Sequence, residues 1–395
     1  WGDALYLWSL SELDAFLGEE RYLGLCRAYC GRFAKSRPAI DQSDTCAPGL
    51  VAHAVWKRTG DPGALSLVED VGRYMLTEPR VVGDAPNHLG HSLEGRFYPA
   101  SVWVDSLMMF GLFALRRGRD EGEEALFELG ARQPRLYASL LQDAGTGLFR
   151  HSWWVRRGGP QPRGPVFWGR GNGWVMASLP MIIGSLPPDH PEAATIEGIL
   201  RRLAEALLAL QRPDGFWTTL LEPESSSYRE SSATALIAAG FLRASREGWL
   251  DPRYAEAGLK AYDALVDSLG EPDSPPAMDG ISLPTIPLHV LPRLGYLAVP
   301  RGRDVSYGLA ALFIAAIEAE KTRAGRISSV YNTRDFSLHV GTPAPAGYPA
   351  SGPDDPFVEE APAWNGAADY AAAYEHRRSA FLAFCRASPA PANLK

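Results

Sequence analysis

Apolar residues recur at helical spacing along nearly the whole chain, and they do so in two alternating patterns. In one set of segments almost every position is apolar or small, which is typical of helices buried on all sides. In the other set, charged residues occupy one face, which is typical of helices between a core and solvent. The first set comprises 4–17, 48–58, 101–115, 172–185, 231–243 and 304–319, and the second comprises 20–34, 64–77, 121–141, 193–211, 253–269 and 367–388.

Six helices of each kind in strict alternation predict an all-α protein in which an outer ring surrounds an inner ring, an (α/α)6 barrel. Neighbouring helices with short connections pack antiparallel, so each inner–outer pair forms one hairpin. A short pattern of an acidic residue, a glycine and an apolar residue follows three of the outer segments, at Gly147, Gly215 and Gly280. It recurs at about the length of one hairpin, with the glycine supplying a turn.

The length of 395 residues, with 46% hydrophobic, suits one barrel, and we expect a single catalytic domain over 1–395. Long connections at 78–100 and 143–171 carry His, Trp and Arg, which favours a functional role for both. A third long connection spans 271–303. The segment 323–366 is rich in Pro, Gly and Ala, and we expect it to be irregular.

Composition excludes several classes of partner. The net charge is −7 without any dense basic run, which argues against nucleic acid, and no apolar stretch reaches the ~20 residues of a membrane helix. Cys26, Cys30, Cys46 and Cys385 lack zinc spacing and are expected to be ordinary thiols. We expect a cytoplasmic protein, with a secreted or periplasmic location left open because the sequence begins at Trp1 without a methionine.

Asp105 is the most informative single residue. Between Arg96 and Arg116 it is the only ionisable side chain apart from the phenol of Tyr98. A lone carboxylate in an apolar segment is costly unless it is paired or neutral. Burial would raise its pKa, which suits a general acid. The alternative is a structural salt bridge or a helix cap.

Arg170 is the corresponding cation, in the run Phe167-Trp-Gly-Arg-Gly-Asn-Gly-Trp174. The three glycines indicate a helix entry whose backbone comes close to another group. A guanidinium there can bind a carboxylate with two hydrogen bonds, or it can simply pair with a core acid such as Asp105. The run lacks the GxGxxG spacing of a phosphate loop.

Three histidines lie in the connections 78–100 and 143–171. His151 precedes two tryptophans, which fits either a sugar subsite or an ordinary surface histidine. His88 and His91 precede the Asp105 segment and are weaker candidates.

Two further acids stand at the entries of inner helices. Asp44 is either an N-cap or a second carboxylate that faces Asp105. For Glu230, capping and packing are favoured over a direct role.

Four motifs occur in an order that resembles glycoside hydrolase family 105, the unsaturated rhamnogalacturonyl hydrolases, and the related family 88, the unsaturated glucuronyl hydrolases. They are Trp103-Val-Asp-Ser-Leu-Met-Met, Gly147-Leu-Phe-Arg-His151, the Phe167–Trp174 run and Glu230-Ser-Ser-Ala-Thr-Ala. The likeness covers about residues 1–322, and the segment 323–366 departs from the family pattern.

The resemblance implies an (α/α)6 barrel that acts on oligosaccharides left by polysaccharide lyases. These carry a 4,5-unsaturated uronic acid at the non-reducing end, and the reaction is hydration of its enol ether. By this resemblance Asp105 protonates C4, a water deprotonated by the same carboxylate adds at C5, and the resulting hemiketal opens. One acid/base residue then suffices, unlike the carboxylate pair of ordinary glycosidases.

The resemblance also implies the binding residues. Asp44 matches a second acid that holds the sugar and the water, and Ser106 stands where the family often has another acid. The positions that match substrate-binding ones are Trp103, His151, Trp168, Arg170, Trp174 and, more loosely, His91. No metal or organic cofactor is implied.

Other functions fit parts of the pattern. An ordinary inverting glycosidase on the same barrel would use Asp44 as its second carboxylate, and a non-catalytic carbohydrate-binding barrel would need neither acid. A sugar epimerase would need a histidine pair that has no clear place in this sequence. The sugar beside the uronate and the oligomeric state are left open.

Overall fold

A computed structural model describes residues 1–35, 39–270 and 276–331. Its α-helices are α1 (Gly2–Leu17), α2 (Leu23–Lys35), α3 (Pro48–Thr59), α4 (Pro62–Thr77), α5 (Leu112–Glu121), α6 (Glu124–Leu141), α7 (Gly169–Ile183), α8 (Pro191–Ala209), α9 (Ser231–Arg246), α10 (Pro252–Asp267), α11 (Pro292–Ala298) and α12 (Ser306–Tyr331). Its short strands are β1 (Arg80–Val82), β2 (Ala85–Pro86), β3 (Ser101–Trp103), β4 (Ser152–Trp154), β5 (Gly159–Gln161), β6 (Ile281–Ser282) and β7 (Arg301–Gly302).

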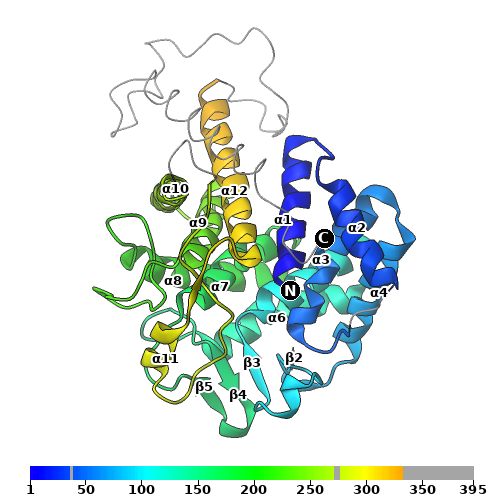
Figure 1. Cartoon of the computed structure of the whole chain (residues 1–395), viewed down its shortest axis with the longest axis horizontal. Helices are drawn as coiled ribbons and strands as arrows, with labels where there is room; N and C mark the ends of the chain where they lie inside the picture. The colour runs from blue at the N-terminus through cyan, green and yellow to red at the C-terminus, as the bar shows by residue number, and fades with distance from the viewer. Residues whose placement is uncertain (36–38, 271–275, 332–395) are drawn as a thin grey trace.

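The helices form two rings, as the alternating patterns predict (Figure 1). The inner helices α1, α3, α5, α7, α9 and α12 pack in sequence, and α12 returns to contact α1. Every residue of α7 is buried, whereas the outer helix α10 buries one face. This is the predicted (α/α)6 barrel. The predicted helix 367–388, and the segment 323–366 from residue 332 onward, lie outside the described residues.

Three segments differ from the sequence prediction. The predicted helix 101–115 begins only at Leu107, because Ser101–Trp103 pairs with β4 as strand β3. The helix α11 interrupts the long connection 271–303. The last inner helix extends to Tyr331 instead of ending near 319, since Arg323 is buried and bonds to Asp263 of α10 at 2.6 Å.

The predicted glycine pattern marks equivalent turns in successive hairpins. Gly147, Gly215 and Gly280 have φ of 80°, 88° and 77°, a region that only glycine enters readily. After α6, the Gln142 side chain donates to the Gly147 carbonyl at 3.0 Å and to a carbonyl of α8 at 3.2 Å. After α8, Gln211 does the same to Gly215 at 3.1 Å and to α10 at 2.9 Å. A glutamine side chain therefore fixes the equivalent turn in both hairpins.

One end of the barrel carries most of the chain that is not helical. Because each outer helix runs antiparallel to its neighbours, all inner helices begin at this end. Figure 1 shows β3, β4, β5 and α11 at the same end. The strands β3, β4 and β5 form one antiparallel sheet. Residues at the starts of the inner helices are thereby brought together.

Close packing of α7 on α9 depends on Gly240. A Cβ at this position would lie 2.2 Å from the carbonyl oxygen of Met176 in α7. We expect Gly240→Ala to lower the free energy of unfolding by about 1–3 kcal/mol, because the two helices must separate. Gly198→Ala is the matched control: nothing lies within 4 Å of a Cβ at this exposed position in α8. It should raise stability by about 0.5–1 kcal/mol. Urea unfolding measures both, and losses of equal size would contradict this account.

Candidate active site

Asp105 lies at the junction between β3 and the inner helix that leads into α5. The register of β3 with β4 pairs Trp103 with Ser152, and the amide of Val104 donates to the His151 carbonyl at 3.1 Å. The next residue, Asp105, is thereby placed beside His151. Its Oδ2 is 3.7 Å from the His151 Nε2, and neither atom has a hydrogen-bond partner among the described residues.

The environment of Asp105 favours its protonated form. Its pKa is raised to about 7, mainly by burial and also by the nearby charge of Asp44, while Arg170 acts in the opposite direction. Its side chain remains 14% exposed, so solvent reaches the carboxyl group. Near neutral pH this group can both donate and accept a proton, as a general acid/base must. The alternative of a helix cap or a structural salt bridge does not describe it.

Asp44 is the second acid of the cluster. It lies in a short 3-10 turn, Ser43–Cys46, immediately before α3. No side chain caps α3, so the N-cap interpretation of Asp44 is wrong and its carboxyl group is free for another role. Burial raises its pKa to about 6, with Arg170 acting in the opposite direction.

His88 lies between Asp44 and Ser106, the residue after Asp105, although the sequence ranked it low. Its Nε2 is 3.6 Å from Asp44 and its Nδ1 is 2.8 Å from the Ser106 hydroxyl. Its ring stacks on Trp103 with centroids 4.2 Å apart. Burial lowers its pKa to about 3, so it stays neutral beside Asp44. Trp103 therefore packs against His88, and its predicted role in binding substrate stays a prediction.

His151 is held from three sides. Its ring stacks on Trp168 with centroids 4.3 Å apart, and it meets Trp103 edge to face with centroids 5.7 Å apart. Its Nδ1 is 2.6 Å from the hydroxyl of Tyr296 in α11. Burial keeps its pKa well below the ordinary value, and the charge of Arg170 acts in the same direction.

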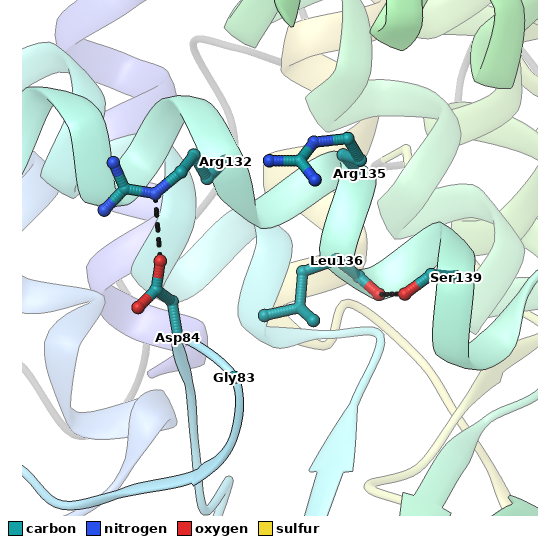
Figure 2. A pocket seen from close by; sticks show the side chains of 6 residues that line it. All are labelled: Gly83, Asp84, Arg132, Arg135, Leu136 and Ser139. Carbon is teal, nitrogen blue, oxygen red and sulfur yellow. Dashed lines mark hydrogen bonds and ion pairs between the residues drawn. The ribbon is translucent and has the colours of Figure 1, made fainter.

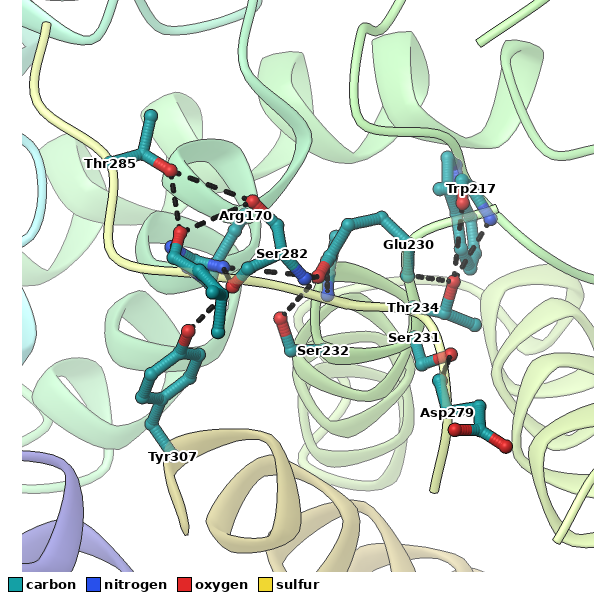
Figure 3. Close-up of polar contacts among 12 residues, drawn as sticks. Arg170, Trp217, Glu230, Ser231, Ser232, Thr234, Asp279, Ser282, Thr285 and Tyr307 are labelled. Atoms are coloured by element: carbon teal, nitrogen blue, oxygen red, sulfur yellow. Dashed lines mark hydrogen bonds and ion pairs between the residues drawn. The ribbon is translucent and has the colours of Figure 1, made fainter. Parts of the chain in front are cut away.

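Arg170 lies in the first turn of α7 and is 1% exposed (Figure 3). Its guanidinium lies between the rings of Trp168 and Tyr307, at 4.6 and 4.8 Å from their centroids. It donates to the backbone carbonyls of Ser282 and Leu283 and lies 3.9 Å from a carboxylate oxygen of Glu230. The pairing with a core acid is thus present, and the acid is Glu230.

Glu230 is fully buried and caps α9, as the sequence analysis favoured, through the amide of Ala233. The same carboxylate accepts from the Ser282 amide at 2.8 Å and from the Ser232 hydroxyl at 2.7 Å. The Ser282 carbonyl accepts from Arg170 and from Tyr307, so both backbone groups of Ser282 are fixed. We call Arg170, Glu230, Tyr307 and Ser282 the anchor cluster (Figure 3).

The glycines around Arg170 permit close backbone contacts. A Cβ on Gly169 would lie 2.3 Å from the Thr218 carbonyl, and one on Gly171 would lie 2.8 Å from the Trp168 ring. The next residue, Asn172, uses its side-chain amide to bond both backbone groups of Phe149: its oxygen accepts from the Phe149 N–H at 2.7 Å and its nitrogen donates to the Phe149 carbonyl at 3.0 Å. This run therefore fixes the loop that carries His151.

The remaining predicted residues lie differently. Trp174 is 1% exposed in α7, and its indole N–H has no hydrogen-bond partner among the described residues. His91 lies apart from the acids: its side chain is 66% exposed and its Nδ1 bonds Glu78 at 2.9 Å. A role for His91 in binding substrate stays a prediction.

Other surfaces offer less chemistry. A hollow of about 270 Å³ lies between α6 and the β1–β2 turn, where Arg132 pairs with Asp84 (Figure 2). It contains none of the predicted site residues. Over the described residues, no group of three or more His, Cys, Asp or Glu side chains is arranged to hold a metal ion. None of the described helices is both long and apolar enough to cross a membrane.

Several known proteins are similar to this chain in sequence and in fold. A profile described as Glycosyl Hydrolase Family 88 matches residues 1–323. The unsaturated rhamnogalacturonyl hydrolase YesR of Bacillus subtilis is 33% identical over 272 residues, which cover 68% of this chain and 74% of YesR. An unsaturated 3S-rhamnoglycuronyl hydrolase of an Alteromonas species is 30% identical over 220 residues, covering 54% of this chain and 53% of that protein. A crystal structure from Salmonella enterica, described as a possible member of the GH105 family, matches with a TM-score of 0.73 and 25% identity over 82% of this chain and 83% of that chain.

The raised pKa of Asp105 has a consequence for stability. The unfolded carboxyl group, near its ordinary pKa of 3.8, loses its proton at lower pH than the folded one, near 7. Protonation of Asp105 therefore favours the folded state, and this contribution is lost as pH rises toward 7. The side chain of Asp105→Asn cannot ionise, so this variant does not lose the contribution. Its free energy of unfolding relative to wild type should therefore be about 2–3 kcal/mol higher at pH 8 than at pH 5, at about 1.4 kcal/mol per unit of pKa.

Urea unfolding at both pH values measures this difference. Asp143→Asn is the control: burial raises the pKa of Asp143, but hydrogen bonds from Arg150 and Thr146 outweigh it and lower the net value. Asp143 is therefore ionised in both states at both pH values, and its variant should differ from wild type equally at pH 5 and 8. A pH-independent difference for Asp105→Asn would show that the Asp105 pKa is not raised.

The anchor cluster predicts a large effect from a small change. Glu230→Gln keeps the side-chain shape but leaves Arg170 buried beside a neutral group, which should cost about 3–5 kcal/mol in unfolding free energy. Asp84→Asn breaks a half-exposed pair with Arg132 and should cost no more than about 1 kcal/mol. Both are measured by urea unfolding at pH 7. Similar losses in the two variants would mean that the anchor cluster contributes no more than a surface pair.

Proposed function

The chain belongs to glycosyl hydrolase family 88, and from this we propose that it removes a 4,5-unsaturated uronic acid from the non-reducing end of oligosaccharides. The reaction that we propose is hydration of the enol-ether double bond of that uronic acid. The Bacillus and Alteromonas relatives support this, since both are named as hydrolases of an unsaturated uronyl sugar. The observation that carries the proposal is the Asp105 carboxyl group, partly exposed, with its pKa raised to about 7 and one oxygen unpartnered.

In the proposed reaction Asp105 acts twice. Its protonated carboxyl group gives a proton to C4 of the unsaturated ring, which leaves positive charge at C5 and the ring oxygen. The resulting carboxylate takes a proton from a water, and the hydroxide adds at C5. The hemiketal formed in this way opens and releases the following sugar, so one carboxyl group returns to its starting state. A pKa near the working pH allows both transfers.

The site also suits an anionic substrate. The inner helices point their N-termini at this end of the barrel, and these ends carry partial positive charge. Arg170 adds a full charge, although its two terminal nitrogens are bonded to backbone carbonyls. We therefore propose that Arg170 attracts the uronate mainly through its charge. Around it, we propose that Trp103, His151, Trp168 and Trp174 shape the sugar pocket.

Asp44 supports a second candidate, an ordinary inverting glycosidase. Two carboxyl groups in one site with pKa values set apart by their surroundings are a usual acid/base pair. The pKa values of Asp44, about 6, and Asp105, about 7, are not set apart, which weakens this candidate, because an inverting pair needs a protonated acid beside an ionised base. In the hydration mechanism Asp44 instead holds the sugar and the water.

We also propose a cytoplasmic location. Cys26, Cys30 and Cys46 are buried free thiols, which is usual in a reducing compartment.

The first test uses unsaturated oligosaccharides made by lyases from rhamnogalacturonan, ulvan and glycosaminoglycans. Hydration removes the conjugated double bond, so the ultraviolet absorbance should fall with wild-type protein on one of these substrates. Asp105→Asn should lower kcat by at least about 10³-fold, because no other described group is placed to supply the proton. Asp44→Asn should retain measurable turnover with a raised KM.

The same variants separate the two candidates on saturated glycosides. Hydration predicts no release of sugar from a saturated analogue by any variant. Release by wild type that is lost equally in Asp44→Asn and Asp105→Asn would favour the inverting glycosidase and overturn the hydration proposal.

A further inference from the structure

Tyr296 is a buried phenol that none of the steps above uses. It lies in α11, is 0% exposed, and packs in a small apolar cluster with Trp168 and Leu220. Its hydroxyl is 2.6 Å from the Nδ1 of His151. The opposite nitrogen of the same ring faces Asp105.

The proton between Tyr296 and His151 has one favourable place. Burial raises the pKa of Tyr296, so the phenol keeps its hydrogen at any working pH. Among the described residues, the Nδ1 of His151 is the only acceptor within hydrogen-bond distance of this hydroxyl. A buried hydroxyl hydrogen without an acceptor is costly, so Tyr296 donates and Nδ1 accepts.

This direction determines the tautomer of His151. The ring is neutral, since burial and the charge of Arg170 hold its pKa well below the ordinary value. A neutral imidazole carries one proton, and with Nδ1 accepting, that proton is on Nε2. Nε2 has no other partner among the described residues, and Asp105 Oδ2 lies 3.7 Å away.

We propose that Tyr296 is a positioning residue that keeps the proton of His151 on Nε2, so that His151 presents an N–H donor to the carboxyl group of Asp105. The proposal rests on the proposed role of Asp105 as the acid of the reaction. In that reaction the donor stabilises the carboxylate that forms when Asp105 gives its proton to C4. With the opposite tautomer, Nε2 would accept a hydrogen bond from the protonated acid and hold its proton back.

The fold supports Tyr296 from outside the inner ring. The segment that carries α11 leaves the barrel at Ser282, whose backbone the anchor cluster fixes on both sides. Farther along, the Tyr98 hydroxyl donates to the Pro287 carbonyl at 2.8 Å. The charged and titratable groups that face the Tyr296–His151 pair are Asp105, His88, Arg170 and Tyr98.

The direct test is nitrogen NMR of histidine-labelled protein, which distinguishes a protonated ring nitrogen from a bare one. The chain has 8 histidines, and His151→Gln identifies the signals of His151. Wild type should show the proton of His151 on Nε2. Tyr296→Phe should shift both nitrogen signals toward a mixture of tautomers. Tyr98→Phe removes a hydroxyl that holds the same segment without touching His151, and it should leave the signals unchanged.

Kinetics test the consequence for Asp105. In Tyr296→Phe the ring can place its proton on Nδ1 and accept from protonated Asp105, which raises the Asp105 pKa. The alkaline limb of kcat/KM should therefore move up by about 0.5–1 pH unit. We expect kcat to fall at least about tenfold with KM changed less than about twofold, since the effect acts on proton transfer. Tyr98→Phe should keep the wild-type pH profile.

The outcomes separate this proposal from the proposed function. A wild-type His151 with its proton on Nδ1 overturns the proposal whatever the activity, as does an unchanged spectrum in Tyr296→Phe. An unshifted pH profile in an active Tyr296→Phe overturns the link to Asp105. If wild-type protein hydrates no unsaturated substrate, the proposed function fails, while the NMR result still decides the tautomer.

Discussion

The parallel direction of the inner helices is the constraint on which this site depends. An inner helix can follow the previous one only through an antiparallel outer helix, so every inner helix begins at the same end of the barrel. Asp44 and Asp105 precede α3 and α5, Arg170 lies in the first turn of α7, and Glu230 caps α9. Residues far apart in the sequence thus become neighbours without any one loop having to reach across the molecule.

The same end also concentrates polar groups that have to be satisfied inside a largely apolar protein. Both oxygens of the Glu230 carboxylate accept hydrogen bonds, from the amides of Ala233 and Ser282. Arg170 in turn donates to the Ser282 carbonyl. Asp105, His151 and Arg170, the last at its Nε, each keep a buried polar atom without a partner among the described residues. Such atoms are costly in a resting protein and are usual where a ligand supplies the missing partner.

Much of this arrangement could be predicted from the sequence. Hydrophobic periodicity specified the two rings, because burial on all sides and burial on one face leave different patterns. Asp105 and Arg170 were recognisable as lone charges in apolar runs. The strand β3 could not be recognised in the sequence, because its three residues continue the apolar character of the helix that follows. Tyr307 could have been found from the rule that inner helices begin at the site. Tyr296 could not, since its position depends on how a long connection folds back over His151, and local sequence carries no signal for that.

The excursion that carries Tyr296 is closed at its base. It begins after β6 and ends before β7, and these strands pair, with Ser282 opposite Arg301. The amide of Leu283 also donates to the Pro300 carbonyl at 2.9 Å. A loop pinched at its neck can change in length at modest entropic cost while its two ends stay where they are. The barrel therefore tolerates variation in this excursion far better than at any inner-helix start, which makes it the place where lineages of such enzymes can diverge in what they accept without losing the fold.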